Sequence, residues 1–334
     1  MASGAVAKIP RFVQQRTSED NAGVYDLSVL YKLRDGSKID VIKFCMNVNL
    51  IAKEYVCCKC GEKMVLSERN DISDGYNWVC RKSDHYIKRT VRKGSWFDGS
   101  RLSIPEILII TYLWVKKTTN EWIIDEFGYI SEPTVTDWKS FCREVCVNML
   151  VSYNYEKKIG GVGMVVEIDE SKFGKRKYNR GKRVEGKWVF GGIERGTTNC
   201  FFKVVEDRTA ETLIEITKKY VEPGSIVLSD CWQSYTSLKN EGYTHYTVNH
   251  SKNFKDPVTG VHTNSIEGTW SAIKTQFRKQ GTNKCKDQFD SYLGEYMFRR
   301  KFGSSGKALF TTFINGIVDL YPPQTEDSKD DPKE

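Results

Sequence analysis

The feature that most constrains the fold is a set of cysteines and one histidine in the N-terminal third of the chain. Cys57 and Cys60 are separated by two residues and followed by Gly61, and Cys80 and His85 come after 19 intervening residues. A Cys-x2-Cys turn places two thiolates about 3.5–4 Å apart, a spacing that suits tetrahedral zinc. We therefore predict a zinc ribbon whose four ligands are Cys57, Cys60, Cys80 and His85.

An alternative is that three buried cysteines lie beside an unrelated surface histidine. We favour zinc because this apolar-poor segment has too few residues to build its own core, so a metal would supply much of its folding free energy. Four protein ligands leave no open position on the ion, which makes the predicted zinc structural and not catalytic. Cys58 is the expected non-ligand, since two adjacent cysteines do not easily reach one ion.

Composition indicates a globular protein and argues against a disordered, fibrous or membrane-spanning one. Hydrophobic residues make up 39% of the 334 residues and charged residues 28%, as in a globular protein. The longest apolar run, Ile107 to Val115, is far below the roughly 20 residues of a membrane-spanning helix, so we predict no membrane partner. The N-terminal residues lack a secretory apolar stretch, so we expect no secretion and read the ten cysteines as ligands or buried side chains.

The positive charge is unevenly distributed. The chain has 51 Lys and Arg against 43 Asp and Glu, a net charge of +8, whereas residues 324–334 carry five acids and two bases. Residues 171–187 hold eight bases and one acid, and residues 81–101 hold seven bases and two acids. Each stretch alone is typical of a solvated loop, but two basic blocks with interleaved aromatic residues favour a nucleic-acid partner.

Three helices are predicted between residues 103 and 150. The first begins at Ser103 with Pro105 in its first turn. The second spans residues 120–127 and ends at Gly128, and the third runs from the Ser131 cap to about Leu150. The last two have the proportions of a helix-turn-helix, although an ordinary three-helix bundle fits equally well. In the helix-turn-helix interpretation, the DNA-binding side chains of the third helix are Thr134, Thr136, Lys139 and Arg143, while Val135, Trp138, Phe141, Cys142 and Val145 pack inward.

From residue 162 onward, strand-like runs alternate with helical ones. Strands are predicted over residues 163–169, 187–194, 200–206 and 225–230, and helices over residues 210–220, 235–241 and 264–279. Several initial strands followed by alternation predict an α/β fold with a mixed sheet and flanking helices.

Three acids stand at positions that suit a metal site. Asp169 and Asp230 each close an apolar strand, where a carboxylate costs free energy unless a positive charge meets it. Each acid also has an ordinary explanation: Asp230 can cap the following helix, and Glu267 has capping-box spacing from Asn264. As a set they suit Mg²⁺ or Mn²⁺, and two such ions about 3.5–4 Å apart would serve phosphodiester chemistry.

The helix over residues 264–279 supports the same interpretation. Its apolar face is Ile266, Trp270, Ile273 and Phe277, which predicts core packing. On the adjacent stripe Glu267 leads to Lys274 and Arg278, a carboxylate followed by bases that can follow DNA phosphates.

Residues 248–270, VNHSKNFKDPVTGVHTNSIEGTW, closely resemble the catalytic signature of Merlin-superfamily DNA transposases and of related bacterial insertion-sequence transposases. The resemblance extends to EIDESKFGKRKYNRGKR around Asp169, LSDCWQSY around Asp230, the CxKCG knuckle and the RTVRKGSWF segment at residues 89–97, covering about residues 38–318. One departure is His85, where the family has a fourth cysteine.

The resemblance implies a ribonuclease-H-like catalytic domain whose D-D-E triad is Asp169, Asp230 and Glu267. It also implies two catalytic Mg²⁺ or Mn²⁺ ions, one structural Zn²⁺, and a homodimer or larger synaptic complex. The double-stranded DNA partners would be the transposon terminal inverted repeats and the target. We expect nuclear localisation if the host is eukaryotic.

Further DNA contacts are expected directly after the first acid, from the basic segment that holds Lys172, Lys175, Arg176, Lys177, Arg180, Lys182 and Arg183. Three residues have accessory interpretations. His262 can assist at the metal site or be a surface or capping histidine, and Asn264 can cap the helix that carries Glu267. Trp232 can belong to the core or stack on an unpaired base.

The predicted organisation has five parts: an N-terminal helical segment (1–52), a zinc ribbon (53–100), a helix-turn-helix (101–152), a catalytic domain (160–318) and an acidic disordered tail (319–334). We predict a cut-and-paste DNA transposase that cleaves DNA and joins the 3′ hydroxyls to a target. The alternative is a domesticated DNA-binding protein that regulates transcription without cleavage. A scaffold of that kind has no need of all three acids.

Overall fold

The computed structural model describes residues 25–82, 84–152, 157–174, 186–248, 262–280 and 288–327. Most of the basic segment, including Lys175, Arg176, Lys177, Arg180, Lys182 and Arg183, therefore lies outside the described residues, as does the chain from 328 onward. No described helix has both the length and the apolar character needed to cross a bilayer.

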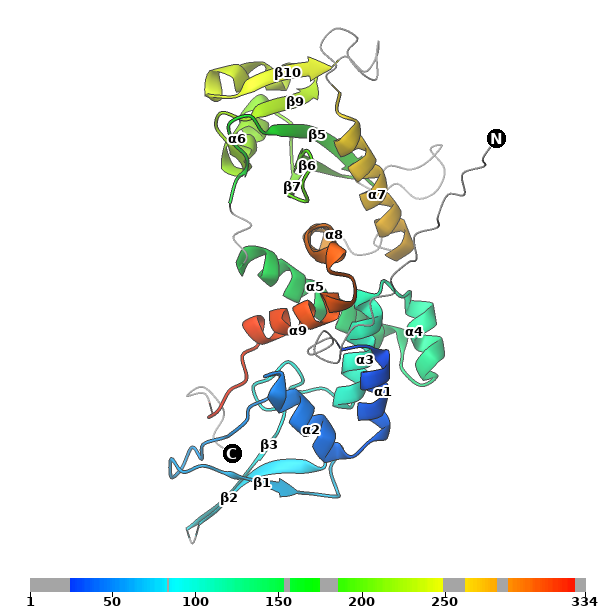
Figure 1. Cartoon of the computed structure of the whole chain (residues 1–334), viewed down its shortest axis with the longest axis vertical. Coiled ribbons are helices and arrows are strands. Elements are labelled where there is room, and N and C mark those ends of the chain that lie inside the picture. The colour runs from blue at the N-terminus through cyan, green and yellow to red at the C-terminus, as the bar shows by residue number, and fades with distance from the viewer. Residues whose placement is uncertain are drawn as a thin grey trace, which may run out of the picture.

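The N-terminal part of the structure combines helices with a small antiparallel sheet. Its elements are α1 (Leu27–Asp35), α2 (Lys38–Asn47), β1 (Val65–Glu68), β2 (Tyr76–Lys82), β3 (His85–Thr90), α3 (Ile104–Val115), α4 (Asn120–Phe127) and α5 (Glu132–Ser152). The three strands pair in the order β1-β2-β3 and lie at one end of the molecule, with α5, α8 and α9 between them and the larger sheet (Figure 1).

The predicted helix starts and stops are confirmed by their caps. The Ser103 side chain accepts from the Glu106 backbone N–H while Glu106 accepts from the Ser103 N–H, and Pro105 lies in the first turn of α3. Gly128 ends α4 in the left-handed conformation with φ of 72°, where a glycine has no steric cost.

The second half of the chain forms the larger sheet and its helices. Its elements are β4 (Ile159–Gly160), β5 (Val165–Phe173), β6 (Lys187–Glu194), β7 (Cys200–Val205), α6 (Ala210–Tyr220), β8 (Val221–Glu222), β9 (Ile226–Asp230), the 3-10 segment η2 (Gln233–Glu241), β10 (Thr244–Val248), α7 (Asn264–Gln280), α8 (Phe289–Phe302), the 3-10 segment η5 (Gly303–Ala308) and α9 (Leu309–Leu320). The helix predicted over residues 235–241 is present as the 3-10 segment η2.

The five-stranded sheet has the order β10-β9-β5-β6-β7. The β5–β6 and β6–β7 pairs are antiparallel, whereas β5–β9 and β9–β10 are parallel, so the predicted mixed sheet is confirmed. One face packs against α7 and α8 through a core that includes Phe173, Trp270 and Phe277. The other packs against α6 and η2 through a core that includes Ile168, Leu213 and Leu238. The sheet is therefore covered on both faces, and its strand ends are where polar residues can gather.

The N-terminal units share one core, which also receives the end of the chain. A single buried cluster joins the zinc-ribbon region, α3 and α5 to Phe310, Phe313 and Ile317 of α9. Helix α9, which we predicted within the catalytic domain, therefore packs with the N-terminal helices. The described residues of the predicted tail also differ from a disordered segment: Asp327 accepts from Arg89 Nε and from Tyr55 Oη, both at 2.8 Å. The prediction of disorder is wrong for residues 319–327.

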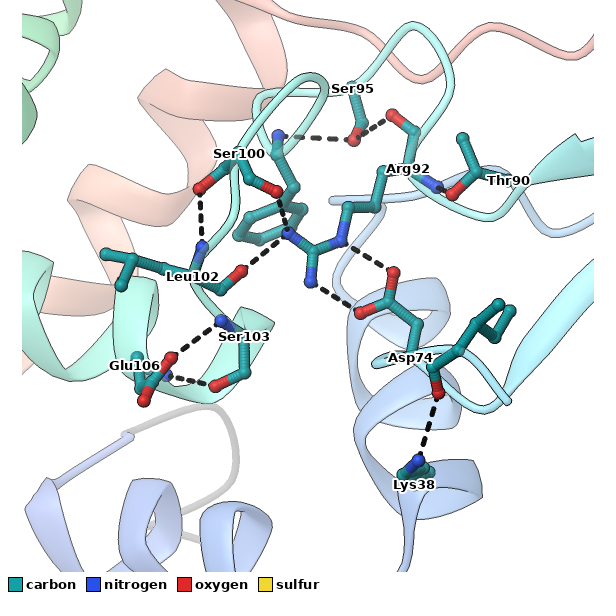
Figure 2. A network of polar contacts seen from close by, with 11 residues as sticks. Lys38, Asp74, Thr90, Arg92, Ser95, Ser100, Leu102, Ser103 and Glu106 are labelled. Atoms are coloured by element: carbon teal, nitrogen blue, oxygen red, sulfur yellow. Dashed lines mark hydrogen bonds and ion pairs between the residues drawn. The ribbon is translucent and has the colours of Figure 1, made fainter. Parts of the chain in front are cut away.

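Arg92 fastens the ribbon to the helices (Figure 2). Its guanidinium donates to both carboxylate oxygens of Asp74 at 2.6 and 2.5 Å, and to the carbonyls of Ser100 and Leu102 at 3.2 and 2.7 Å. Arg92 is 5% exposed. Together with the Arg89–Asp327 pair, this shows that part of the basic block 81–101 is neutralised inside the protein and does not face a polyanion.

Candidate active site and metal centre

Asp169 and Asp230 lie at matching positions of neighbouring parallel strands. The pairing of β5 with β9 ends at Glu167 opposite Leu228, and each aspartate stands two residues farther along its strand. Paired residues of parallel strands point to the same face, so both carboxylates lie on the side that α7 covers. Asp230 ends β9 as predicted, but the prediction that Asp169 closes its strand is wrong, because β5 continues to Phe173 in its pairing with β6. The sheet topology thus brings together two acids that are 61 residues apart in sequence.

The environment of Asp169 raises its proton affinity. Trp270 Nε1 of α7 donates a hydrogen bond to Asp169 Oδ2 at 3.0 Å. Burial raises the pKa of Asp169 to about 7, and the negative charges of Asp230 and Glu267 act in the same direction. All three predicted acids therefore interact electrostatically at one place, as expected of a site that requires a positive counter-charge.

Glu267 lies in the first turn of α7 and its side chain is exposed. Thr263 Oγ1 donates to Glu267 Oε1 at 3.4 Å. Asn264 is itself the first residue of the helix, so the capping-box alternative does not describe this turn. Asp230 does have a local role: its Oδ1 accepts from the Trp232 backbone N–H at 3.0 Å.

Glu167, which was not among the predicted site residues, connects β5 to the start of α7. Its carboxylate is 0% exposed; one oxygen accepts from Arg195 Nε at 2.5 Å and the other from the Ile266 backbone N–H at 2.9 Å. Arg195 Nη2 also donates to the His262 carbonyl at 2.5 Å. The pair therefore fixes the backbone on both sides of the α7 N-terminus. A glutamate inside the apolar run before Asp169 was the available signal, since a fully buried carboxylate requires partners.

Replacing Glu167 with leucine is expected to destabilise the protein by about 3 kcal/mol or more, because it leaves the Arg195 guanidinium and the Ile266 N–H without their acceptor. Glu167→Gln retains an acceptor for the N–H and should lose about 1–2 kcal/mol. Urea unfolding gives the comparison. The control is Glu241→Gln, which breaks the partly exposed surface pair with Lys218 and should cost less than about 1 kcal/mol. Equal losses for Glu167→Leu and Glu241→Gln would contradict the structural role of Glu167.

A second missed acid, Glu170, faces the opposite side of β5. Tyr235 Oη donates to Glu170 Oε1. Burial raises the pKa of Glu170 to about 7, and the charges of Asp169 and Asp230 add to the shift. Among the described residues, Glu167 and Glu170 thus join the three acids of the predicted site, Asp169, Asp230 and Glu267.

The predicted acids supply only oxygen donors, and partial burial disfavours the charged form of Asp169. That donor chemistry fits a hard divalent cation such as Mg²⁺ or Mn²⁺. In the described part of the chain, the only group of three or more potential ligands whose atoms all lie within 4.8 Å of one another is a Cys–His set, so the carboxylates are less closely gathered. Lys274, the predicted base on the same helix, is half-buried with Nζ 5.3 Å from the Phe173 ring, and Arg278 is exposed.

The Cys–His set consists of the four residues predicted to bind zinc. The sulfur of Cys57 lies 3.4 Å from His85 Nε2, Cys80 Sγ lies 3.3 Å from the same nitrogen, and Cys60 Sγ lies 3.6 Å from Cys80 Sγ. Three sulfurs and one imidazole nitrogen that converge in this way form a donor set for tetrahedral zinc. Cys57 and Cys80 also belong to the main core cluster, so the ribbon and the helical core depend on each other.

The surroundings of the Cys–His set also fit a metal site. Asp84 Oδ1 lies 2.9 Å from His85 Nδ1, a carboxylate contact that orients a ligating imidazole. Cys58, the predicted non-ligand, is exposed and lies outside the set. Its sulfur is 3.8 Å from Arg89 Nη2.

The predicted DNA-contacting residues of α5 are only partly available. Thr134 and Thr136 are half-buried, and Lys139 Nζ donates to the Thr118 carbonyl at 2.9 Å. Arg143 is 3% exposed, with its guanidinium 4.1 Å from the Tyr292 ring. It cannot reach DNA from this position, which corrects that prediction. Phe141 is 44% exposed, so its predicted inward packing is also wrong.

The accessory residues all lie near the acids. His262 is held by Arg195, whose Nη2 is 3.0 Å from His262 Nδ1. Trp232 is half-buried and packs against the core on the α6 side of the sheet. Lys172, the described member of the basic segment, is exposed.

Comparisons with known proteins identify the family. The model of the ISXO2-like transposase domain matches residues 159–301. An uncharacterized transposase-like protein of Haemophilus influenzae is 31% identical over 96 residues, which cover 29% of this chain and 76% of that protein.

Among solved structures, the likeness is distant. The Mos1 strand transfer complex has a TM-score of 0.25 at 11% identity, covering 67% of this chain and 79% of that chain. The mariner Mos1 paired-end complex with Mg has a TM-score of 0.27 at 12% identity, covering 67% and 80%.

The matched residues 159–301 include β5, β9 and most of the described catalytic region, and the relative and the domain model agree with the resemblance found in the sequence. The chain belongs to the transposase family that carries the ISXO2-like transposase domain.

Proposed function

We propose that this transposase acts by cut-and-paste: it binds transposon ends, cleaves the DNA strands and joins the 3′ hydroxyls to a target. The observation that carries the proposal is that Asp169 of β5 and Asp230 of β9 lie on neighbouring interior strands and that the charges of Asp230 and Glu267 both act on Asp169. Three antiparallel strands followed by two parallel ones support assignment of a ribonuclease-H-like domain. The site would operate in the nucleus if the host is eukaryotic.

In this proposal Asp169, Asp230 and Glu267 would hold divalent metal ions. When bound, such ions would lower the pKa of the attacking water or hydroxyl and neutralise the leaving oxygen. Trp270 fixes one oxygen of Asp169, and the Glu167–Arg195 pair fixes the helix that presents Glu267. The nucleophile is water in the cleavage step and the 3′ hydroxyl in the joining step, so no covalent protein intermediate is needed.

DNA would be held by the zinc ribbon and by α4 and α5 acting as a helix-turn-helix. The support is that α5 begins beside the Gly128 turn and that its Thr134 and Thr136 are partly exposed. Joining two ends requires two active sites, so we propose a homodimer or a larger complex.

The test is incubation of the purified protein with a plasmid that carries candidate transposon ends, with and without Mg²⁺. Nicks or double-strand breaks at the ends support the proposal, and joined products establish strand transfer. Binding without any cleavage in Mg²⁺ or Mn²⁺ would contradict it and favour a regulatory DNA-binding protein.

The basic segment after Asp169 gives a separate prediction. Replacing Lys175, Arg176 and Lys177 with alanine should weaken binding to any DNA and lower the slope of log affinity against log salt by about two to three, because each phosphate contact contributes roughly one unit. Preference for transposon ends over random DNA should change little, since phosphate contacts carry no sequence information. Full affinity and an unchanged slope would show that the segment is an ordinary solvated loop.

A further inference from the structure

An arginine lies between two tryptophans beside the acids. The guanidinium carbon of Arg208, in the loop before α6, is 3.6 Å from the centroid of the Trp188 ring and 4.5 Å from that of Trp232. All three side chains are partly buried. Lys172 extends over the same Trp188 ring, with Nζ 5.3 Å from its centroid. We call Arg208, Lys172 and the two indoles the Arg208 site.

The Arg208 site borders the acids directly. The Trp232 backbone N–H donates to Asp230, and the Trp232 ring packs edge-on against Tyr235, which donates to Glu170. Trp188 of β6 pairs with Lys172 of β5. Lys172 is three residues beyond Asp169 along β5. Trp188 and Trp232 pack on the α6 side of the sheet, opposite to the side of the Asp169 carboxylate, and the positive charge of Arg208 there stabilises the Glu170 carboxylate. DNA that approaches the carboxyl end of β9 from the α6 side would pass Arg208 before it meets Asp230.

Arg208 differs from Arg92, Arg195 and Arg299, and resembles Arg143 in lying over an aromatic ring, although Arg143 is 3% exposed. Arg92, Arg195 and Arg299 each pair with a carboxylate and donate to backbone carbonyls. Among the described residues, the Arg208 guanidinium has no ion pair and no hydrogen bond. The backbone carbonyl of Arg208 accepts a hydrogen bond from Ser234 Oγ. Stacking on an indole uses the face of a guanidinium and leaves the N–H groups at its edge free to donate.

We propose that the Arg208 site binds a backbone phosphate of the DNA strand that enters the acidic site. The planar guanidinium offers a bidentate donor pair that matches two phosphate oxygens, and the exposed Lys172 ammonium adds a second positive charge. The two indoles restrict the conformations of the Arg208 side chain before any phosphate binds, so less conformational entropy is lost on binding. The charges also offset the repulsion between the acids and the DNA. This inference rests on the proposed function, since it concerns the same substrate.

The experiment compares Arg208→Gln, Arg208→Lys and a control, Lys219→Gln. Lys219 is exposed near the other end of α6 and also contacts an aromatic ring, with Nζ 5.7 Å from Tyr220, so its replacement removes one charge and one cation–π contact away from the acids. Binding of a short random-sequence DNA duplex is measured over a series of salt concentrations without divalent metal. Cleavage of a plasmid with transposon ends is measured separately in Mg²⁺, and the melting temperature of each variant is recorded.

We expect Arg208→Gln to lower the salt slope by about one unit and to slow cleavage by about tenfold. Arg208→Lys should keep most of the slope, because the charge remains, while cleavage still falls because the bidentate geometry is lost. Lys219→Gln should match the wild type in both measurements. An Arg208→Gln variant with wild-type slope and cleavage, whether or not its melting temperature falls, would overturn the proposal and leave the cation–π contacts with a packing role only.

Failure of this inference is distinguishable from failure of the proposed function. If the wild type cleaves DNA while both Arg208 variants behave like the control, the Arg208 site is wrong and the transposase mechanism stands. If the wild type binds but does not cleave, a reduced slope for Arg208→Gln still supports the phosphate site. A wild-type protein with no measurable affinity for DNA would overturn both.

Discussion

Asp169→Asn, Asp230→Asn and Glu267→Gln are each expected to reduce strand cleavage by about a thousandfold or more while leaving DNA binding largely intact. Each substitution removes a charged oxygen ligand, and a loss of about 4 kcal/mol in stabilisation of the transition state corresponds to that factor. The measurement is cleavage of end-containing DNA in Mg²⁺, together with binding of the same DNA without metal.

Glu170→Gln is the matched control for the triad variants. Glu170 is the neighbour of Asp169 in sequence and its pKa is also raised by burial to about 7, but its side chain points across the sheet to Tyr235. We expect its cleavage rate to stay within about tenfold of the wild type, since a residue that only shapes the surroundings costs less than a metal ligand. Near wild-type cleavage by any of the three triad variants would remove that residue from the active site.

Loss of zinc is the second change with a large expected effect. The purified protein should carry about one Zn²⁺ per chain, and Cys60→Ser should lose both the ion and the fold of residues 55–95. Binding of structural zinc contributes on the order of 10 kcal/mol to folding of small zinc domains. Because Cys57 and Cys80 pack in the main core, the damage should extend to the N-terminal helices. Metal analysis and limited proteolysis, before and after chelation, measure these effects.

Cys58→Ser provides the control for zinc, because it removes the adjacent exposed thiol, which lies outside the Cys–His set. It should keep the metal and the protease resistance of the wild type. Protein purified without chelator that contains no zinc would refute the assignment. Equal zinc loss from Cys58→Ser and Cys60→Ser would instead show that the ligand set is wrong.

Local signals in the sequence were sufficient for much of the structure. The capping residues of α3, the glycine after α4 and the apolar face of α7 act within one or two turns of the chain, so they could be read before any packing was known. The spacing of Cys57, Cys60, Cys80 and His85 likewise constrains a short segment, and the structure gathers those four residues.

Other features depend on contacts between distant parts of the chain. Arg143 stands on α5 at a position that resembled an exposed basic residue, but α8 covers it with Tyr292. Asp327 looked like part of an acidic tail, yet Arg89 and Tyr55 hold it against the ribbon. Nothing near either residue in the sequence indicates its partner.

The sequence by itself determined the ligand set of the ribbon, the mixed α/β class and the three candidate acids. Only the tertiary structure decided that Asp169 and Asp230 stand at matching positions, that Glu167 and Arg195 hold the helix of Glu267, and that Arg208 lies between two indoles. The physical reason is that propensities, caps and ligand spacings act over a few residues. Burial and charge pairing, in contrast, are set by whichever distant side chains the packed sheet and helices bring together.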